Sequence, residues 1–140
     1  MKSVYLIKPE GMLLRNSIQQ LITNAGLTIV GSKLVTIDEF AIEQLYRQVS
    51  GDLLTIMRSE LLHKSCEMGI VEAEHAVRVL LALCGHKTNP QKCKDGTIRK
   101  MLGANLEPIT LGRAVYYKNI IHRSRTKREA ECDLYLYDLL

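Results

Sequence analysis

The sequence NIIHRS at residues 119–124 decides how the last part of this chain folds, because an apolar pair there leads directly into polar residues. If residues 115–121 form a strand, side-chain alternation puts His122 and Ser124 on one face and the two neighbouring arginines on the other. A neutral imidazole beside a hydroxyl group is one arrangement that holds a nucleophile. The same spacing also fits a histidine that only ends a strand next to a solvated basic surface.

The residues that follow, TKRE at 126–129, fit the S/T-x-x-E pattern of a helix capping box. A helix is therefore expected to start directly behind His122. The free backbone N–H groups at a helix start favour anions. An anionic ligand beside the histidine is one consequence of this order.

Length and composition favour one domain over residues 1–140, since 46% of the residues are hydrophobic and this length buries a sizeable core. The net charge of +4 permits an anionic ligand without requiring nucleic acid. The cysteines follow no metal-ligand or disulfide spacing, which predicts reduced thiols in a cytoplasmic protein. They are Cys66, Cys84, Cys93 and Cys132. The only apolar run near the N-terminus is too short for a membrane span, so no membrane association is expected.

Hydrophobic periodicity predicts alternating strands and helices. Strands are expected at residues 3–7, 27–35, 66–71 and 115–121, and helices at residues 14–25, after a TIDE capping box at 36–39, at 53–62, at 77–84 and after residue 126. Gly31 interrupts the second strand, where a bulge or a close backbone approach is expected. Residues 100–118 are expected to form an ordered loop with some strand content. The order βαββαβ predicts an α+β ferredoxin-like sandwich, with a four-stranded antiparallel sheet covered on one face by helices.

Four short motifs, in this order, resemble those of the nucleoside diphosphate kinase family. They are YLIKPEG at residues 5–11, TNP at 88–90, GTIR at 96–99 and NIIHRS at 119–124. The likeness covers about residues 3–137, and the chain resembles a divergent member of the family. It implies transfer of the γ-phosphate of a nucleoside triphosphate to a diphosphate in a ping-pong cycle. It also implies ATP and other nucleotides as partners, Mg²⁺ carried by the nucleotide with no metal site in the protein, and a homo-oligomer built from dimers.

The resemblance implies a role for each matching residue. His122 is the expected nucleophile, supported by Ser124 and by an acid on the following helix, either Asp133 or Glu129. The expected phosphate and ribose contacts are hydrogen-bond donors, namely Lys8, Tyr46, Thr88, Arg99 and Asn119. Free imidazole is largely unprotonated at neutral pH, so it can attack phosphorus without a strong base. The loose transition state of phosphoryl transfer then needs in-line positioning and donors around the phosphate oxygens.

The sequence departs from the family pattern at two binding positions. Leu81 or Ala82 stands where the family has an arginine on the helix before the TNP motif. Arg78 lies about one helical turn earlier on the same face, which makes it a hypothetical substitute phosphate ligand. The alternative is that Arg78 is a solvated helix residue, and that Arg113, Arg123, a cation of the insertion or no residue at all takes the place of the missing arginine. Leu54 falls near the aromatic residue that stacks on the nucleobase, so base contact at Leu54 is expected to be only hydrophobic.

Two further departures border the histidine motif. Arg123 and Arg125 replace a Gly-Asp pattern that often surrounds the serine in the family. The link from Arg99 to Asn119 is markedly longer than usual, so residues 100–118 contain an insertion next to the expected site.

Two alternative functions stay open at this point. The first is a weakly active or inactive regulatory relative that binds nucleotide, which the missing helix arginine favours and the retained His122 opposes. The second is a nucleic-acid-binding α+β module. Its supporting residues are Arg123, Arg125, Lys127, Arg128, Tyr116 and Tyr117. The small net charge and the lack of an RNP-like aromatic motif make nucleic acid an unfavoured partner.

Overall fold

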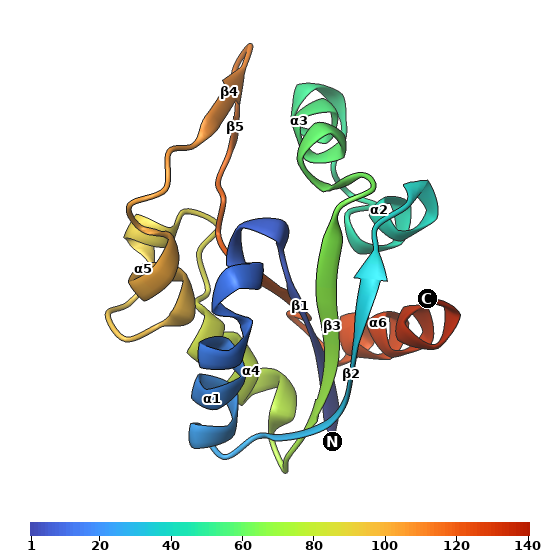
Figure 1. The fold of residues 1–140 in the computed structure, drawn as a ribbon, viewed down its shortest axis with the longest axis vertical. Coiled ribbons are helices and arrows are strands. Elements are labelled where there is room, and N and C mark those ends of the chain that lie inside the picture. Colours follow the sequence, from blue (N-terminus) through green and yellow to red (C-terminus); the bar gives the residue numbers. More distant parts are fainter.

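The computed structural model describes residues 1–140 and contains the predicted four-stranded antiparallel sheet. Its strands are β1 (Lys2–Ile7), β2 (Thr28–Thr36), β3 (Ser65–Glu72) and β6 (Ile121–Arg123), in the order β2-β3-β1-β6. A separate hairpin consists of β4 (Ile109–Leu111) and β5 (Ala114–Tyr116). This strand order and the antiparallel pairing confirm the ferredoxin-like α+β fold (Figure 1).

Helices cover both faces of the sheet, whereas the sequence pattern predicted one covered face. The helices are α1 (Arg15–Asn24), α2 (Glu39–Leu45), α3 (Gly51–Leu61), α4 (Ala76–Cys84), α5 (Ile98–Gly103) and α6 (Lys127–Leu139), with short 3₁₀ turns η1 (Pro9–Leu14) and η2 (Pro90–Lys92). In Figure 1, α1 and α4 lie on one side of the sheet, and α2 and α6 lie on the other. None of these helices is both long enough and apolar enough to cross a bilayer.

The burial of β1 explains why both faces are covered. Every residue from Ser3 to Ile7 is buried, so this strand has no solvent-facing row of side chains. Tyr5 and Ile7 pack in one apolar cluster with α1 and α4, while Val4 and Leu6 pack in a second cluster with α2 and α6. A continuous apolar run of this kind is typical of a strand covered on both sides, so the sequence held the signal for a three-layer arrangement.

The predicted irregularity at Gly31 is confirmed. The pairing of β2 with β3 shifts register between Ile29 and Gly31, as a β-bulge requires. A Cβ added to Gly31 would lie 3.0 Å from the hydroxyl oxygen of Tyr137 on α6. Glycine therefore serves both the bulge and the close approach of that side chain.

The two predicted capping boxes have different outcomes. Thr126 caps α6 as predicted, because its side chain accepts a hydrogen bond from the N–H of Glu129. At the TIDE segment the N-cap is Asp38, whose carboxylate accepts from the N–H of Ala41. The prediction of Thr36 as the cap is wrong because Thr36 is still the last residue of β2 and pairs with Ser65.

The predicted single strand at residues 115–121 is also wrong. The N–H of Ile121 donates to the carbonyl of Asn119, so the chain makes a three-residue γ-turn centred on Ile120, whose φ is 77°. The backbone N–H of Lys8 donates to the carbonyl of Ile120 (2.8 Å) and Glu10 Oε2 accepts from the N–H of Ile120 (3.1 Å), which holds this strained residue in place. The turn separates β5 from β6.

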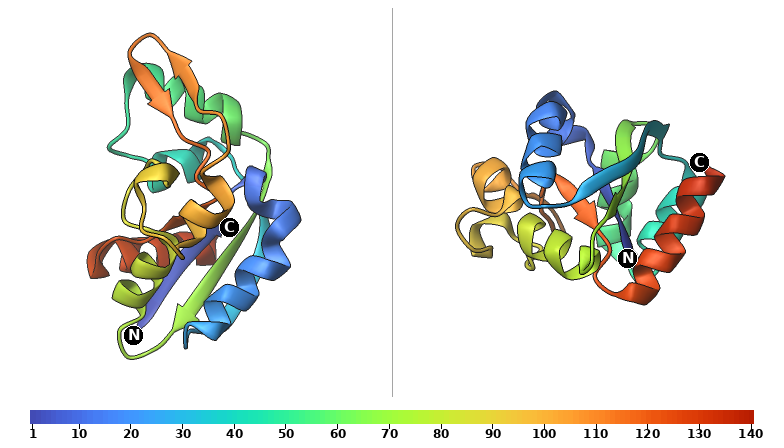
Figure 2. Two further views of the ribbon diagram at one scale, coloured as in Figure 1. Left: turned by 90° about the vertical axis from the view of Figure 1, so that its left-hand side faces the viewer. Right: turned by 90° about the horizontal axis from the view of Figure 1, so that it is seen from below.

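Residues 100–118 contain more structure than the predicted loop. Their first part completes α5, which the sequence reading did not identify, and their second part forms the β4–β5 hairpin. Figure 2 shows this hairpin extending away from the sheet to lie beside α3. The tip of the hairpin touches the start of α3, since a Cβ added to Gly112 would lie 2.5 Å from the carboxylate of Asp52.

Candidate active site

A cavity of about 640 Å³ lies beside β6, the strand at one edge of the sheet. Its walls come from the end of β1, the end of α2, α3, the segment before η2, α5, the β5 strand, β6 and α6. Seven of the residues predicted from sequence line it, namely Lys8, Tyr46, Thr88, Arg99, Asn119, His122 and Asp133. The fold therefore gathers side chains from distant parts of the chain into one cavity.

His122 lies on β6 with its side chain 14% exposed. Its Nε2 atom is buried, makes no hydrogen bond and lies 3.6 Å from Asp133 Oδ2. Its Nδ1 atom also has no hydrogen-bond partner. Unlike Nε2, Nδ1 is accessible, and His122 lines the cavity. The imidazole is thus oriented with one nitrogen toward a carboxylate and the other toward the cavity.

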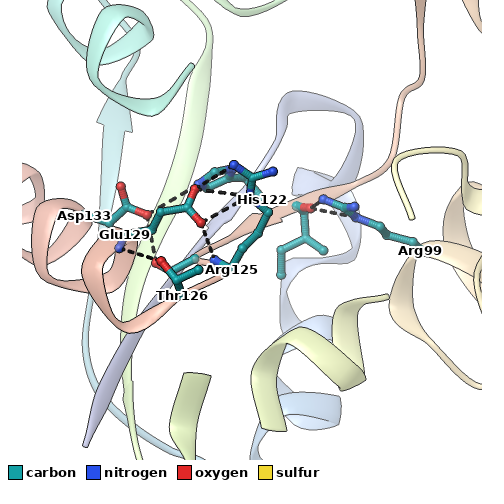
Figure 3. A network of polar contacts seen from close by, with 8 residues as sticks. Arg99, His122, Arg125, Thr126, Glu129 and Asp133 are labelled. Atoms are coloured by element: carbon teal, nitrogen blue, oxygen red, sulfur yellow. Dashed lines mark hydrogen bonds and ion pairs between the residues drawn. The ribbon is translucent and has the colours of Figure 1, made fainter. Parts of the chain in front are cut away.

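A serine and a carboxylate on one side of the sheet support this orientation. Ser124 is fully buried, and its Oγ donates to Asp133 Oδ2 at 2.8 Å, the same oxygen that faces His122. Glu129, the other candidate acid, instead accepts hydrogen bonds from the N–H and the guanidinium of Arg125 (Figure 3). Of the two acids, Asp133 is the one that neighbours the histidine.

The predicted distribution of side chains around β6 is correct for three of four residues. His122 and Ser124 both approach Asp133 on α6. Arg123 instead donates to the carbonyl of Gly85, the residue directly after α4. Arg125 lies beyond the strand and pairs with Glu129 on α6, so its expected place on the Arg123 face is wrong. The carboxylate in the first turn of α6 is that of Glu129.

Arg99 is 5% exposed, and backbone carbonyls fix its guanidinium (Figure 3). Nε and Nη2 donate to the carbonyl of Ile121 at 3.2 and 2.8 Å, and Nη1 donates to the carbonyl of Lys87 at 2.9 Å. The side chain thereby joins α5 to β6 and to the segment before the TNP motif. Each Nη atom keeps a second N–H available for a ligand.

Asn119 connects two other predicted ligands. Its Oδ1 accepts from Lys8 Nζ at 3.1 Å, and its Nδ2 donates to the carbonyl of Thr88 at 3.0 Å. Thr88 itself is exposed and lines the cavity. The amide of Asn119 thus fixes the lysine and the loop relative to each other.

Lys8 is 2% exposed, and its ammonium group lies 4.4 Å from the ring centroid of Tyr116 and 3.7 Å from Glu10 Oε2. Burial lowers the pKa of Lys8 to about 8, since desolvation outweighs the attraction of Glu10. Tyr46 is half-buried, and its ring meets the His122 ring edge-on with centroids 5.4 Å apart. Burial also raises the pKa of the Tyr46 phenol above its ordinary value, so this hydroxyl remains a neutral donor.

Three residues predicted from sequence do not line the cavity, namely Ser124, which is buried against Asp133, and also Leu54 and Arg78. Leu54 packs against the apolar cluster of α2 and α6, and its neighbour Leu53 lines the cavity in its place. Arg78 is exposed in the first turn of α4, and the end of α4 that approaches the site is the opposite one, at Gly85. Seven residues of helix span about 10 Å, so the hypothesis that Arg78 substitutes as a phosphate ligand is wrong.

Several cavity residues are not among the predicted site residues, and three of them, Leu53, Tyr116 and Arg123, bear on the function. Leu53 was missed because a shift of one residue on a helix rotates a side chain by about 100°. Tyr116 was read only as a nucleic-acid candidate, although its place in the insertion beside the site was a usable signal. For Arg123 the sequence leaves a solvated surface residue and a substitute for the missing helix arginine equally open, and nothing in it shows that Arg123 is buried and bonded to the end of α4.

Known proteins match nearly the whole chain. A family model described as nucleoside diphosphate kinase matches residues 1–137. The nucleoside diphosphate kinase of Pyrococcus furiosus is 31% identical over 140 residues, which cover 97% of this chain and 81% of the relative. A relative of the same name from Staphylococcus haemolyticus is 30% identical and covers 97% of this chain and 86% of its own length.

Solved structures agree with the sequence matches. A nucleoside diphosphate kinase from Encephalitozoon cuniculi superposes with a TM-score of 0.81 at 26% identity, covering 97% of this chain and 87% of that one. The enzyme from Halobacterium salinarum, solved in complex with CDP, has a TM-score of 0.81 at 25% identity and covers 98% and 86%.

The named relatives and the family model make this chain a phosphotransferase. The chain belongs to the nucleoside diphosphate kinase family.

Proposed function

We propose that this protein transfers the γ-phosphate of a nucleoside triphosphate to a nucleoside diphosphate, and that His122 carries the phosphoryl group between them. The orientation of the imidazole is the observation that supports this role. Nε2 faces Asp133, so a proton on Nε2 leaves the lone pair of Nδ1 directed at the cavity. In steady state, double-reciprocal plots for ATP and an acceptor diphosphate should be parallel, since a covalent intermediate separates the two half-reactions.

The proposed half-reaction balances at this nitrogen. Nδ1 attacks the γ-phosphorus as the bond to the β-phosphate oxygen breaks, and the nucleoside diphosphate leaves with that oxygen. The ring becomes more positive, and Asp133, held by Ser124, stabilises it through Nε2–H. Lys8 and Arg99 supply donors and positive charge for the phosphate oxygens, which is most of what the loose transition state requires. Attack by the acceptor diphosphate on phosphohistidine reverses the sequence.

The residues of the chain fit a magnesium ion that arrives with the nucleotide. No group of three His, Cys, Asp or Glu side chains is placed to hold a metal ion. The two carboxylates of the cavity are engaged, Asp133 by Ser124 and Glu129 by Arg125. Mg²⁺ would therefore bind phosphate oxygens and water, where it neutralises phosphate charge.

The partners and context of the enzyme follow from the same proposal. ATP and other nucleoside di- and triphosphates are its partners, and the CDP complex of the Halobacterium salinarum protein supports nucleotide binding in this fold. We expect residues 1–140 to act as one domain in the cytoplasm, as a homo-oligomer built from dimers. Analytical ultracentrifugation of the purified protein tests the oligomeric state.

The lowered pKa of Lys8 predicts a pH dependence. The buried ammonium is charged below about pH 8 and neutral above it, so kcat/KM for ATP should fall as the pH rises through about 8. Steady-state rates between pH 6 and 10 measure this. In Lys8→Met the rate should be lower throughout and the decline near pH 8 absent. A decline that persists unchanged in Lys8→Met would assign it to another group.

The position of Leu53 predicts which leucine contacts the nucleobase. Leu53 lines the cavity opposite the β4–β5 hairpin, so Leu53→Ala should weaken ADP binding by about 1 kcal/mol, roughly fivefold. Leu54→Ala is the matched control, because Leu54 packs against the core and its loss should lower the free energy of unfolding by about 1–2 kcal/mol with little change in Kd. Calorimetric titration and thermal unfolding of both variants separate the effects, and the opposite pattern would place the base elsewhere.

A further inference from the structure

Arg123 is a buried arginine on β6 that the proposed half-reaction does not yet use. It is 5% exposed and lines the cavity. Its Nε and Nη2 donate to the carbonyl of Gly85 at 3.1 and 2.8 Å, and Nη2 also approaches the carbonyl of His86 at 3.4 Å. Nη1 has no hydrogen-bond partner. It is not among the fully buried polar atoms that lack one, so it is accessible to solvent. The carbonyls therefore fix a guanidinium that keeps a free donor edge.

The charge of Arg123 is not neutralised within the protein. Neither Arg123 nor Arg99 takes part in an ion pair, and all the acceptors of both side chains are backbone carbonyls. Burial lowers the pKa of Arg123 to about 10, and repulsion from Arg99 adds to this effect. Two buried cations without a carboxylate are costly unless an anion binds beside them.

A purely structural role accounts for only part of this arrangement. Gly85 ends α4, and cations commonly bond the last carbonyls of a helix, so Arg123 fastens β6 to that helix end. One arginine is enough for that contact. It does not explain why a second unpaired guanidinium, Arg99, lies close by and lines the same cavity. No side chain of α4 itself reaches the cavity.

We propose that Arg123 binds a phosphate group of the nucleotide together with Arg99, as a second guanidinium of the phosphate site. This inference rests on the proposed function, and it names a residue that holds the di- or triphosphate chain. The ligand class is a nucleoside di- or triphosphate, because two adjacent guanidinium groups suit several phosphate oxygens at once. A nucleoside monophosphate offers fewer of them.

The test is calorimetric titration of ADP and AMP into the wild-type protein and into Arg123→Gln. Losing a charged donor should raise the Kd for ADP about ten- to a hundredfold and change that for AMP much less. Arg78→Gln is the matched control, because this exposed arginine lies on α4 outside the cavity and its loss should leave both affinities unchanged. Arg123→Gln with the ADP affinity of the wild type would overturn the proposal and leave Arg123 as a link between β6 and α4.

A second measurement keeps the proposal testable if Arg123→Gln does not fold. The Nε–Hε resonance of Arg123 in the wild type, assigned with Arg123→Lys, should shift on addition of ADP or pyrophosphate and not of adenosine. A resonance that ignores ADP and pyrophosphate would overturn the proposal. If the wild type takes label from γ-labelled ATP but neither the titration nor the resonance responds as expected, only the role of Arg123 is refuted. A wild type that neither binds ADP nor takes label refutes the proposed function as well.

Discussion

His122→Ala is expected to lower the kcat of phosphoryl transfer between nucleotides by at least about 10⁴-fold. The substitution removes the proposed nucleophile, an imidazole that lines the cavity with Nε2 facing the Asp133 carboxylate and Nδ1 without a hydrogen-bond partner. Alanine is smaller than histidine and leaves the backbone pairing of β6 with β1 unchanged, so the fold should persist. A coupled assay with ATP and an acceptor diphosphate measures the loss.

The matched control for this substitution is His75→Ala. His75 is exposed at the start of α4 and does not line the cavity, so its loss should leave the rate unchanged. Circular dichroism confirms that both variants are folded. Substantial transfer activity in folded His122→Ala would rule out the covalent route and favour direct transfer between two bound nucleotides.

Arg99→Gln is expected to lower kcat/KM by about 10²–10³-fold, the usual loss when one preorganised donor to a developing charge is removed. It should also lower the free energy of unfolding by about 1–3 kcal/mol, because the carbonyls of Ile121 and Lys87 lose their donors. Thermal unfolding and steady-state kinetics, measured on the same preparation, separate the two effects.

The neighbouring Lys100→Gln is the control for charge and position. Lys100 bonds the carbonyl of Gln91 outside the cavity, so this variant loses one positive charge without losing a cavity donor. We expect nearly normal kcat/KM for it. If Arg99→Gln retained full activity per folded molecule, Arg99 would serve only to join α5 to β6.

The sheet was predictable because its signals are local. The strands β1, β2 and β3, the glycine bulge at Gly31 and the capping threonine at Thr126 follow from side-chain chemistry that acts within a few residues. The burial of both faces was also readable from the continuous apolar run of β1. The expectation of one covered face ignored that run.

The γ-turn at Ile120 shows what the sequence could not reveal. A β-branched residue rarely takes a positive φ, and here long-range bonds to Lys8 and Glu10 impose it. Propensity at residues 115–121 favours an uninterrupted strand. Tertiary contacts decide otherwise, and they place Asn119 between the lysine and the TNP loop.

The positions of the arginines were equally hidden. Helical spacing correctly places Arg78 near Leu81 and Ala82, but only the structure shows that this turn of α4 lies away from the cavity. Arg123 is buried because an edge strand meets the end of a helix, a contact between segments far apart in sequence. Motif order predicted seven residues that line the cavity, and packing determines which arginines line it with them.

The most direct test of the central claim is a phosphoryl chase on the wild-type protein. The protein is incubated with γ-labelled ATP, freed of nucleotide, and then mixed with unlabelled GDP. We predict a protein-bound label that survives alkali, is lost in acid, maps to His122 and moves quantitatively to GTP. Label released only as inorganic phosphate, or rapid ATP-to-GDP transfer with no label on the protein, would contradict a phosphohistidine intermediate at His122.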